Sequence, residues 1–88
     1  MKIDTINPTS LSAAFGSVIA DLRFNQRLTQ QELARISGLS ERYVGALEKG
    51  AYRPSIVTVH SIALALKVDP WLLVERAYKV ADKNTETQ

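Results

Sequence analysis

The sequence contains no cysteine among its 88 residues. This absence excludes disulfides, thiolate metal sites and cysteine nucleophiles, and it suits a reducing cytosol. No apolar run approaches the roughly 20 residues that a membrane helix needs. The first residues, MKIDTINPTS, also lack the apolar core of a signal peptide. We therefore expect a cytoplasmic protein that has no membrane partner.

Charge of one sign and groupings of catalytic residues are also scarce. The formal net charge is only +2, which is compatible with nucleic acid but does not identify it. His60 is the only histidine, and its place beside Val59 favours packing or a surface position over catalysis. No nucleophile is paired with a base, and neither a glycine-rich phosphate loop nor a metal-ligand spacing occurs. The sequence predicts no enzyme activity, no cofactor and no metal.

Helical periodicity is what the sequence has in abundance. Apolar residues recur at three- and four-residue steps in five segments, without an alternating strand pattern or an internal repeat. This pattern predicts an all-α fold, a compact five-helix bundle formed by one domain over residues 10–82. Residues 1–9 are expected to be a flexible arm and residues 83–88 a frayed tail.

Individual residues mark the expected helix ends. Ser10 is expected to cap the first helix, and Thr29 with Glu32 forms a capping box for the second. Gly38 is expected to end the second helix in a left-handed conformation, and Ser40 to cap the third. The side chains predicted to face the core are Leu33, Ile36, Val44, Leu47, Ile56, Val59, Ile62, Ala63 and Leu66.

The stretch from Thr29 to Gly50, TQQELARISGLSERYVGALEKG, is the most informative part of the chain. It predicts two short helices joined by a glycine turn, which is the layout of a helix-turn-helix that places a helix in the DNA major groove. The side of the second helix away from its apolar residues presents Ser40, Glu41, Arg42, Gly45, Ala46 and Lys49. Arginine can bind guanine, glutamate can accept from cytosine, and alanine can touch a thymine methyl.

Gly45 is unusual within that helix, because an interior glycine costs roughly 1 kcal/mol relative to alanine. A bare backbone on the outward side indicates close approach by another molecule, and DNA is the natural candidate. The alternative is that this short polar face is only solvated.

The chain resembles the helix-turn-helix family of lambdoid phage repressors and Cro, also called the xenobiotic-response-element type, from about Val18 to Leu73. The matching motifs are Leu28-Thr29-Gln30, Glu32-Leu33-Ala34, Gly38, Ser40, Val44, Leu47-Glu48, Gly50, Pro54-Ser55, Ala63-Leu64-Ala65-Leu66 and Trp71-Leu72-Leu73. The resemblance implies a lambda-repressor-like DNA-binding domain. In size the chain is similar to the controller proteins of restriction-modification systems.

The resemblance also implies a role for particular residues. The residues expected to contact DNA bases are Ser40, Glu41, Arg42 and Ala46. The residues expected to contact phosphates are Gln30, Tyr43, Lys49 and Arg53. Arg23 and Glu48 would form a structural salt bridge between the first and third helices. For Tyr43 a half-buried packing role, and for Arg53 a merely solvated charge, remain the alternatives.

Because one recognition helix contacts only a few base pairs, we expect two copies about 34–36 Å apart on an inverted repeat. Trp71 and Leu72 are predicted to close the bundle. The residues predicted at the subunit contact are Leu73, Val74, Ala77 and Tyr78. The expected partners are thus double-stranded DNA and a second copy, in a transcription regulator for which repression is the commoner outcome.

The main alternative function is binding of a partner protein. An antitoxin uses this fold both to bind DNA and to hold its partner, and an adaptor would keep only the second property. Retention of Gln30, Arg42, Lys49 and Arg53 argues against the adaptor.

Overall fold

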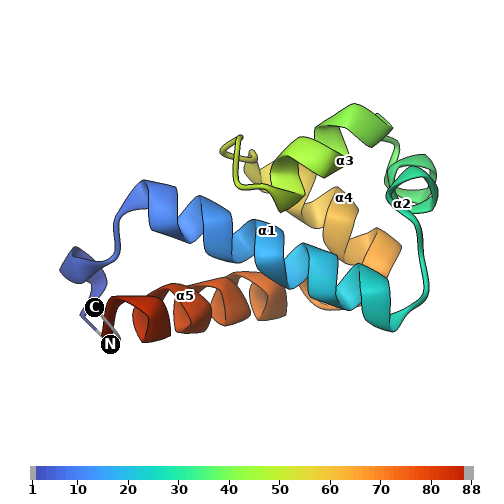
Figure 1. Cartoon of the computed structure of the whole chain (residues 1–88). Helices are drawn as coiled ribbons and strands as arrows, with labels where there is room; N and C mark the ends of the chain where they lie inside the picture. The colour runs from blue at the N-terminus through green and yellow to red at the C-terminus, as the bar shows by residue number, and fades with distance from the viewer. Residues whose placement is uncertain (1, 87–88) are drawn as a thin grey trace.

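The computed structural model describes residues 2–86, which form helices and no strand. The helices are α1 (Pro8–Asn25), α2 (Gln30–Ser37), α3 (Glu41–Glu48), α4 (Ile56–Leu66) and α5 (Pro70–Glu86), preceded by a short 3-10 helix at Ile3–Thr5. The long helices α1 and α5 lie side by side and antiparallel (Figure 1). The shorter helices α2, α3 and α4 lie together on one side of α1. The predicted all-α, five-helix fold is confirmed.

Both ends of the helical domain differ from the prediction. Helix α1 begins at Pro8, because the Asn7 side chain accepts a hydrogen bond from the Ser10 backbone N–H at 2.8 Å and so caps the helix in place of Ser10. Pro8 suits the first turn, where no N–H is needed. At the other end α5 continues to Glu86, since no glycine or proline interrupts it. The arm and the tail are therefore shorter than expected, and residues 87–88 lie outside the described part.

The predicted signals at the centre of the chain are present. The Thr29 hydroxyl accepts from the Glu32 backbone N–H at 3.0 Å, and the Glu32 carboxylate accepts from the Thr29 N–H at 2.9 Å. The hydrogen bond that the Glu32 carboxylate accepts from the Thr29 backbone holds the pKa of Glu32 below its ordinary value. Gly38 has a φ of +74°, and Ser40 accepts from the Tyr43 N–H at 3.0 Å. The short helices α2 and α3 thus start and stop where the local sequence predicts.

The core draws on all five helices. The largest fully buried side chains are Ile19, Leu33, Val44, Leu47, Ile62, Leu66 and Leu73. Two predicted core residues lie outside it, because Ile36 is 48% exposed and Ile56 is 85% exposed. Helix α2 has only eight residues and buries Leu33 and Ala34, which leaves Ile36 on its outer side. Ile56 is the first residue of α4, where the chain only begins to enter the core.

Helix α5 packs with a different face from the one predicted. Leu73, Ala77 and Ala81 recur every four residues and are all buried within the single chain, so Leu73 and Ala77 are core residues and not subunit contacts. The two alanines allow α5 to lie close against its neighbours. Because α5 turns the face with Leu73 and Ala77 toward the core, Trp71 is 70% exposed and Leu72 is only half-buried. Trp71 therefore does not close the bundle. Val74 stays on the surface, 39% exposed.

Candidate nucleic-acid interface

Helix α3 is fixed in the domain by one side only. Val44 and Leu47 are buried in the core, whereas Glu41 and Arg42 on the outer side are exposed. The outer side borders a shallow hollow between α2, α3 and the chain that follows α3. The residues around this hollow are Gln30, Glu41, Arg42, Gly45, Ala46, Lys49 and Ala51. The structure therefore gathers most of the predicted DNA-contacting residues at one place.

Ala51 is the member of this group that the sequence did not single out. It follows the left-handed Gly50, and its backbone N–H donates to the Ala46 carbonyl oxygen at 3.0 Å. This bond folds the chain back against the last turn of α3. Gly50, near the end of α3, was the signal available in the sequence. It predicts a turn, but it does not show that the residue after it, Ala51, borders the hollow.

Gly45 lies on the outer side of α3, where it borders the hollow. A Cβ built on it would lie 3.5 Å from Oε1 of the Gln30 side chain, so its bare backbone faces the start of α2. Gly45 and Gln30 together line the hollow. The missing side chain thus keeps the space between α2 and α3 open, which leaves room for another molecule to approach both helices at once.

A single carboxylate joins the helices that form this hollow. Glu48, the last residue of α3, accepts from Arg23 in α1 through Nε to Oε2 at 2.7 Å and Nη2 to Oε1 at 3.1 Å. Nε2 of Gln30, the first residue of α2, donates to the same Oε1 at 2.9 Å. The Arg23 and Glu48 side chains are only 11% and 7% exposed. The salt bridge implied by the resemblance is therefore present, and it extends to Gln30.

The electrostatics of this cluster keep its arginine charged. The hydrogen bonds that Arg23 donates to the Glu48 carboxylate raise the pKa of Arg23 despite partial burial. Nη1 of Arg23 also donates to the Leu28 carbonyl oxygen at 2.8 Å, so the guanidinium holds the turn between α1 and α2 as well. One amide hydrogen of Gln30 remains available for a group in the hollow after it has bonded Glu48.

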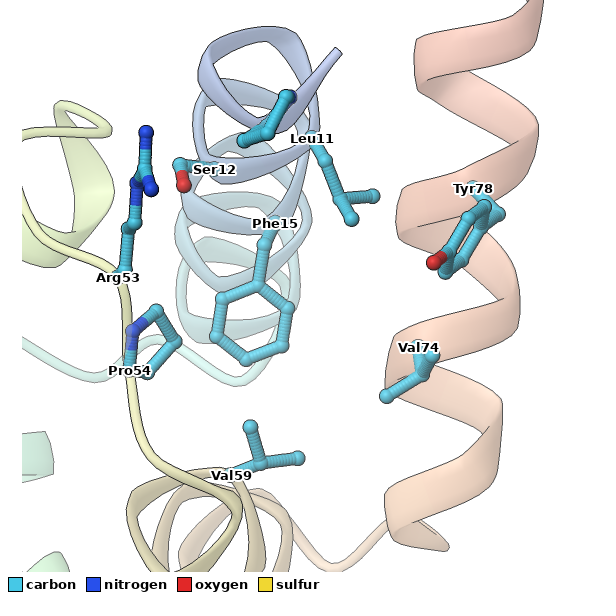
Figure 2. A pocket seen from close by; sticks show the side chains of 9 residues that line it. Leu11, Ser12, Phe15, Arg53, Pro54, Val59, Val74 and Tyr78 are labelled. Atoms are coloured by element: carbon cyan, nitrogen blue, oxygen red, sulfur yellow. The ribbon is translucent and has the colours of Figure 1, made fainter. Parts of the chain in front are cut away.

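Tyr43 and Arg53 lie apart from the hollow. The Tyr43 ring is half-buried against the core and stacks on Tyr52, with 5.5 Å between the ring centroids. This placement favours the packing alternative for Tyr43. Arg53 is exposed and lies at the mouth of a different hollow, between α1, α4 and α5 (Figure 2). Ser40 is exposed at the leading end of α3, where its hydroxyl oxygen is engaged as the helix cap.

Within residues 2–86, no three side chains of His, Asp or Glu gather in a way that could hold a metal ion. No single helix in that range is long and apolar enough to cross a bilayer; α4 and α5 reach the length and composition only as a pair, which is bent by 104°.

Comparisons with known proteins agree with this geometry. A family model described as Helix-turn-helix matches residues 19–70. An uncharacterized HTH-type transcriptional regulator, y4dJ, of Sinorhizobium fredii is 42% identical over 53 residues, which cover 60% of this chain and 69% of that protein.

Solved structures of controller proteins are similar as well. The restriction-modification controller protein C.AhdI from Aeromonas hydrophila is 38% identical with a TM-score of 0.68, over 69% of this chain and 92% of that one. C.Esp1396I, solved as a tetramer in complex with its natural 35 base-pair operator, is 25% identical with a TM-score of 0.73, over 81% and 93%. The matched segment contains the whole helix-turn-helix, and the chain belongs to the helix-turn-helix family of DNA-binding transcriptional regulators.

Proposed function

We propose that this protein is a homodimeric, sequence-specific repressor that reads an inverted-repeat operator with α3. The observation that carries the proposal is the hollow beside α3, where exposed Arg42 and Lys49 border a space that the Glu48 cluster holds rigid. Positively charged and polar groups around an open, preordered surface suit the edge of a DNA duplex.

Direct base contacts are assigned to Ser40, Glu41, Arg42 and Ala46. Arg42 carries most of them, because its guanidinium can bind the two acceptors of guanine at once. Glu41 can accept from the amino group of cytosine, and Ala46 offers a methyl group to thymine. The hydroxyl of Ser40 still has its own proton to donate while its oxygen caps α3.

Phosphate contacts are assigned to Gln30, Lys49 and Arg53, whereas Tyr43, first predicted as a phosphate contact, is assigned its packing role against the core. Gln30 lies at the N-terminus of α2, where unpaired backbone N–H groups and the helix dipole favour an anion. Its bond to Glu48 holds the amide in place before DNA arrives. Lys49 follows α3 and is exposed, so it can reach a phosphate beside the groove.

Selection of bound sites from a random duplex library tests this proposal, and we expect an enriched inverted repeat. Arg42→Ala should cost roughly 1–3 kcal/mol on the selected site and relax the preference at one position of each half-site. Arg76→Ala is the matched control, because Arg76 is exposed on α5 and does not border the α3 hollow. Equal losses for Arg42→Ala on selected and random DNA would remove Arg42 from its role in base recognition.

The proposed dimer forms through exposed apolar side chains at the starts of α4 and α5. Ile56, Trp71 and Val74 are all exposed and lie around one hollow. Val74 belongs to the predicted subunit contact, and Tyr78 lies half-buried one helical turn further along α5. Large apolar residues grouped on a surface are typical of protein contacts. The operator-bound tetramer of the similar C.Esp1396I supports an assembly of several copies on DNA.

Trp71→Lys is expected to raise the dimer dissociation constant by roughly 30-fold or more, as for a central aromatic residue at an interface. The folded chain should tolerate the change, because Trp71 is 70% exposed. Sedimentation at micromolar concentration measures the effect. Leu64→Lys is the control, since Leu64 is 66% exposed on α4 and does not border this hollow. A wild-type protein that stays monomeric, even on DNA, would rule out the dimer.

A further inference from the structure

A second hollow, of about 260 Å³, opens between the first half of α1, the segment before α4, and helices α4 and α5 (Figure 2). Its mostly apolar lining includes Leu11, Phe15, Pro54, Val59, Val74 and the ring of Tyr78. Phe15 is only 6% exposed, so the floor of the hollow is part of the core. Four separate segments of the chain contribute walls, and small-molecule sites are commonly such mostly apolar concavities with few polar groups.

Arg53 and Ser12 lie at one end of this hollow, and the Tyr78 hydroxyl lies on the α5 side (Figure 2). Figure 2 shows the Arg53 side chain extending beside Ser12 of α1, whereas Val74 and Tyr78 reach toward Phe15 from α5. Among residues 2–86, no side chain forms a hydrogen bond or an ion pair with the Arg53 guanidinium. No acidic residue lines the hollow. An apolar space with one uncompensated cation at its mouth is complementary to a molecule that has an apolar body and an anionic end.

We propose that this hollow binds a small apolar carboxylate, with its hydrocarbon body against Phe15 and Val74 and its carboxylate on Arg53. A fork of two N–H donors matches the geometry of a carboxylate. An apolar side chain from a second copy could also fill the space, but it would leave the Arg53 guanidinium without an anionic partner. Ile56 and Trp71 of the dimer group border a neighbouring hollow and do not line this one, whereas Val74 borders both hollows.

The ligand would act on DNA binding through Arg53. The same guanidinium cannot hold a carboxylate and a DNA phosphate at once, so the carboxylate should weaken DNA binding and DNA should weaken carboxylate binding by the same factor. This regulatory consequence rests on the proposed function, in which Arg53 contacts a phosphate. Binding of the carboxylate itself does not depend on DNA. Carboxylate binding and its effect on DNA binding are therefore measured separately.

Octanoate is the probe for the DNA-free protein, used below its micelle concentration and followed by amide chemical shifts and calorimetry. We expect saturable one-to-one binding with shifts at Ser12, Val59 and Tyr78. Arg53→Gln should weaken octanoate binding roughly threefold to tenfold, as for one partly solvated charged hydrogen bond, and leave binding of uncharged octanol unchanged. Ser12→Leu, which fills the hollow, should abolish binding of both probes.

Arg76→Gln is the matched control, because it removes an exposed arginine that does not line the hollow and should leave octanoate affinity unchanged. Non-saturable binding, insensitivity to Arg53→Gln, or shifts that appear only with a change of oligomeric mass would overturn the ligand site. Octanoate should weaken operator binding by the wild type and not by Arg53→Gln. A protein that binds octanoate as expected but no DNA would overturn the proposed function alone.

Discussion

Glu48→Ala is expected to lower the free energy of unfolding by about 3 kcal/mol, the lower end of the range for breaking a buried ion pair. The change leaves the Arg23 guanidinium, only 11% exposed, with the Leu28 carbonyl as its remaining acceptor. It also removes the acceptor of the Gln30 amide. Thermal unfolding followed by circular dichroism measures the loss, at roughly 4–8 °C per kcal/mol for a domain of this size.

The double variant Arg23→Met, Glu48→Met is the control for this effect. Replacing both charges with apolar side chains leaves no unpaired ion, and such replacements are often neutral or stabilising. The double variant should therefore regain most of the stability, while DNA affinity stays reduced because Gln30 is no longer held. A single variant within about 1 kcal/mol of the wild type would show that the pair contributes as little as a surface salt bridge.

Gly16→Ala is expected to destabilise the domain by about 3 kcal/mol, although alanine favours a helix more than glycine does. A Cβ at Gly16 would overlap the Leu47 carbonyl oxygen and lie 2.7 Å from that of Glu48. Both atoms are backbone, so α1 and the end of α3 must move apart. Since Arg23 reaches Glu48 across the same gap, the ion pair should lengthen as well. Urea unfolding gives the change in free energy.

Gly45→Ala is the matched control, because it makes the same substitution in a helix without the overlap. Its Cβ would meet only the Gln30 side chain, at an ordinary contact distance of 3.5 Å. This variant should gain up to about 1 kcal/mol of stability from helix propensity. If Gly16→Ala were as stable as Gly45→Ala, the close approach of α1 to α3 would not be a requirement of the fold.

Local signals in the sequence predicted the helix-turn-helix well. The capping box of Thr29 and Glu32, the left-handed Gly38 and the cap at Ser40 each act within a few residues. The residues that determine where α2 begins and ends and where α3 begins therefore all lie in one short stretch of sequence. The pairing of Arg23 with Glu48 spans 25 positions, and only the resemblance to a family indicated it.

Features that depend on packing between distant helices were not predictable in the same way. Helical spacing groups Leu73 with Ala77 correctly, but it does not say whether that face meets the core or a second copy. Gly16 is an interior helical glycine like Gly45, and only the position of the Leu47 and Glu48 carbonyls shows why it is needed. Arg53 follows α3 in the sequence, yet the turn carries it to the hollow beside α1.

An amide chemical-shift map of the protein bound to its selected duplex tests the role of α3 most directly. We predict that the largest shifts fall at the start of α2 and along residues 40–51, around the hollow that Arg42 and Lys49 border. The surface of α5 around Arg76 should change little. Largest shifts on the exposed faces of α4 and α5, with residues 40–51 unaffected, would contradict DNA recognition by α3.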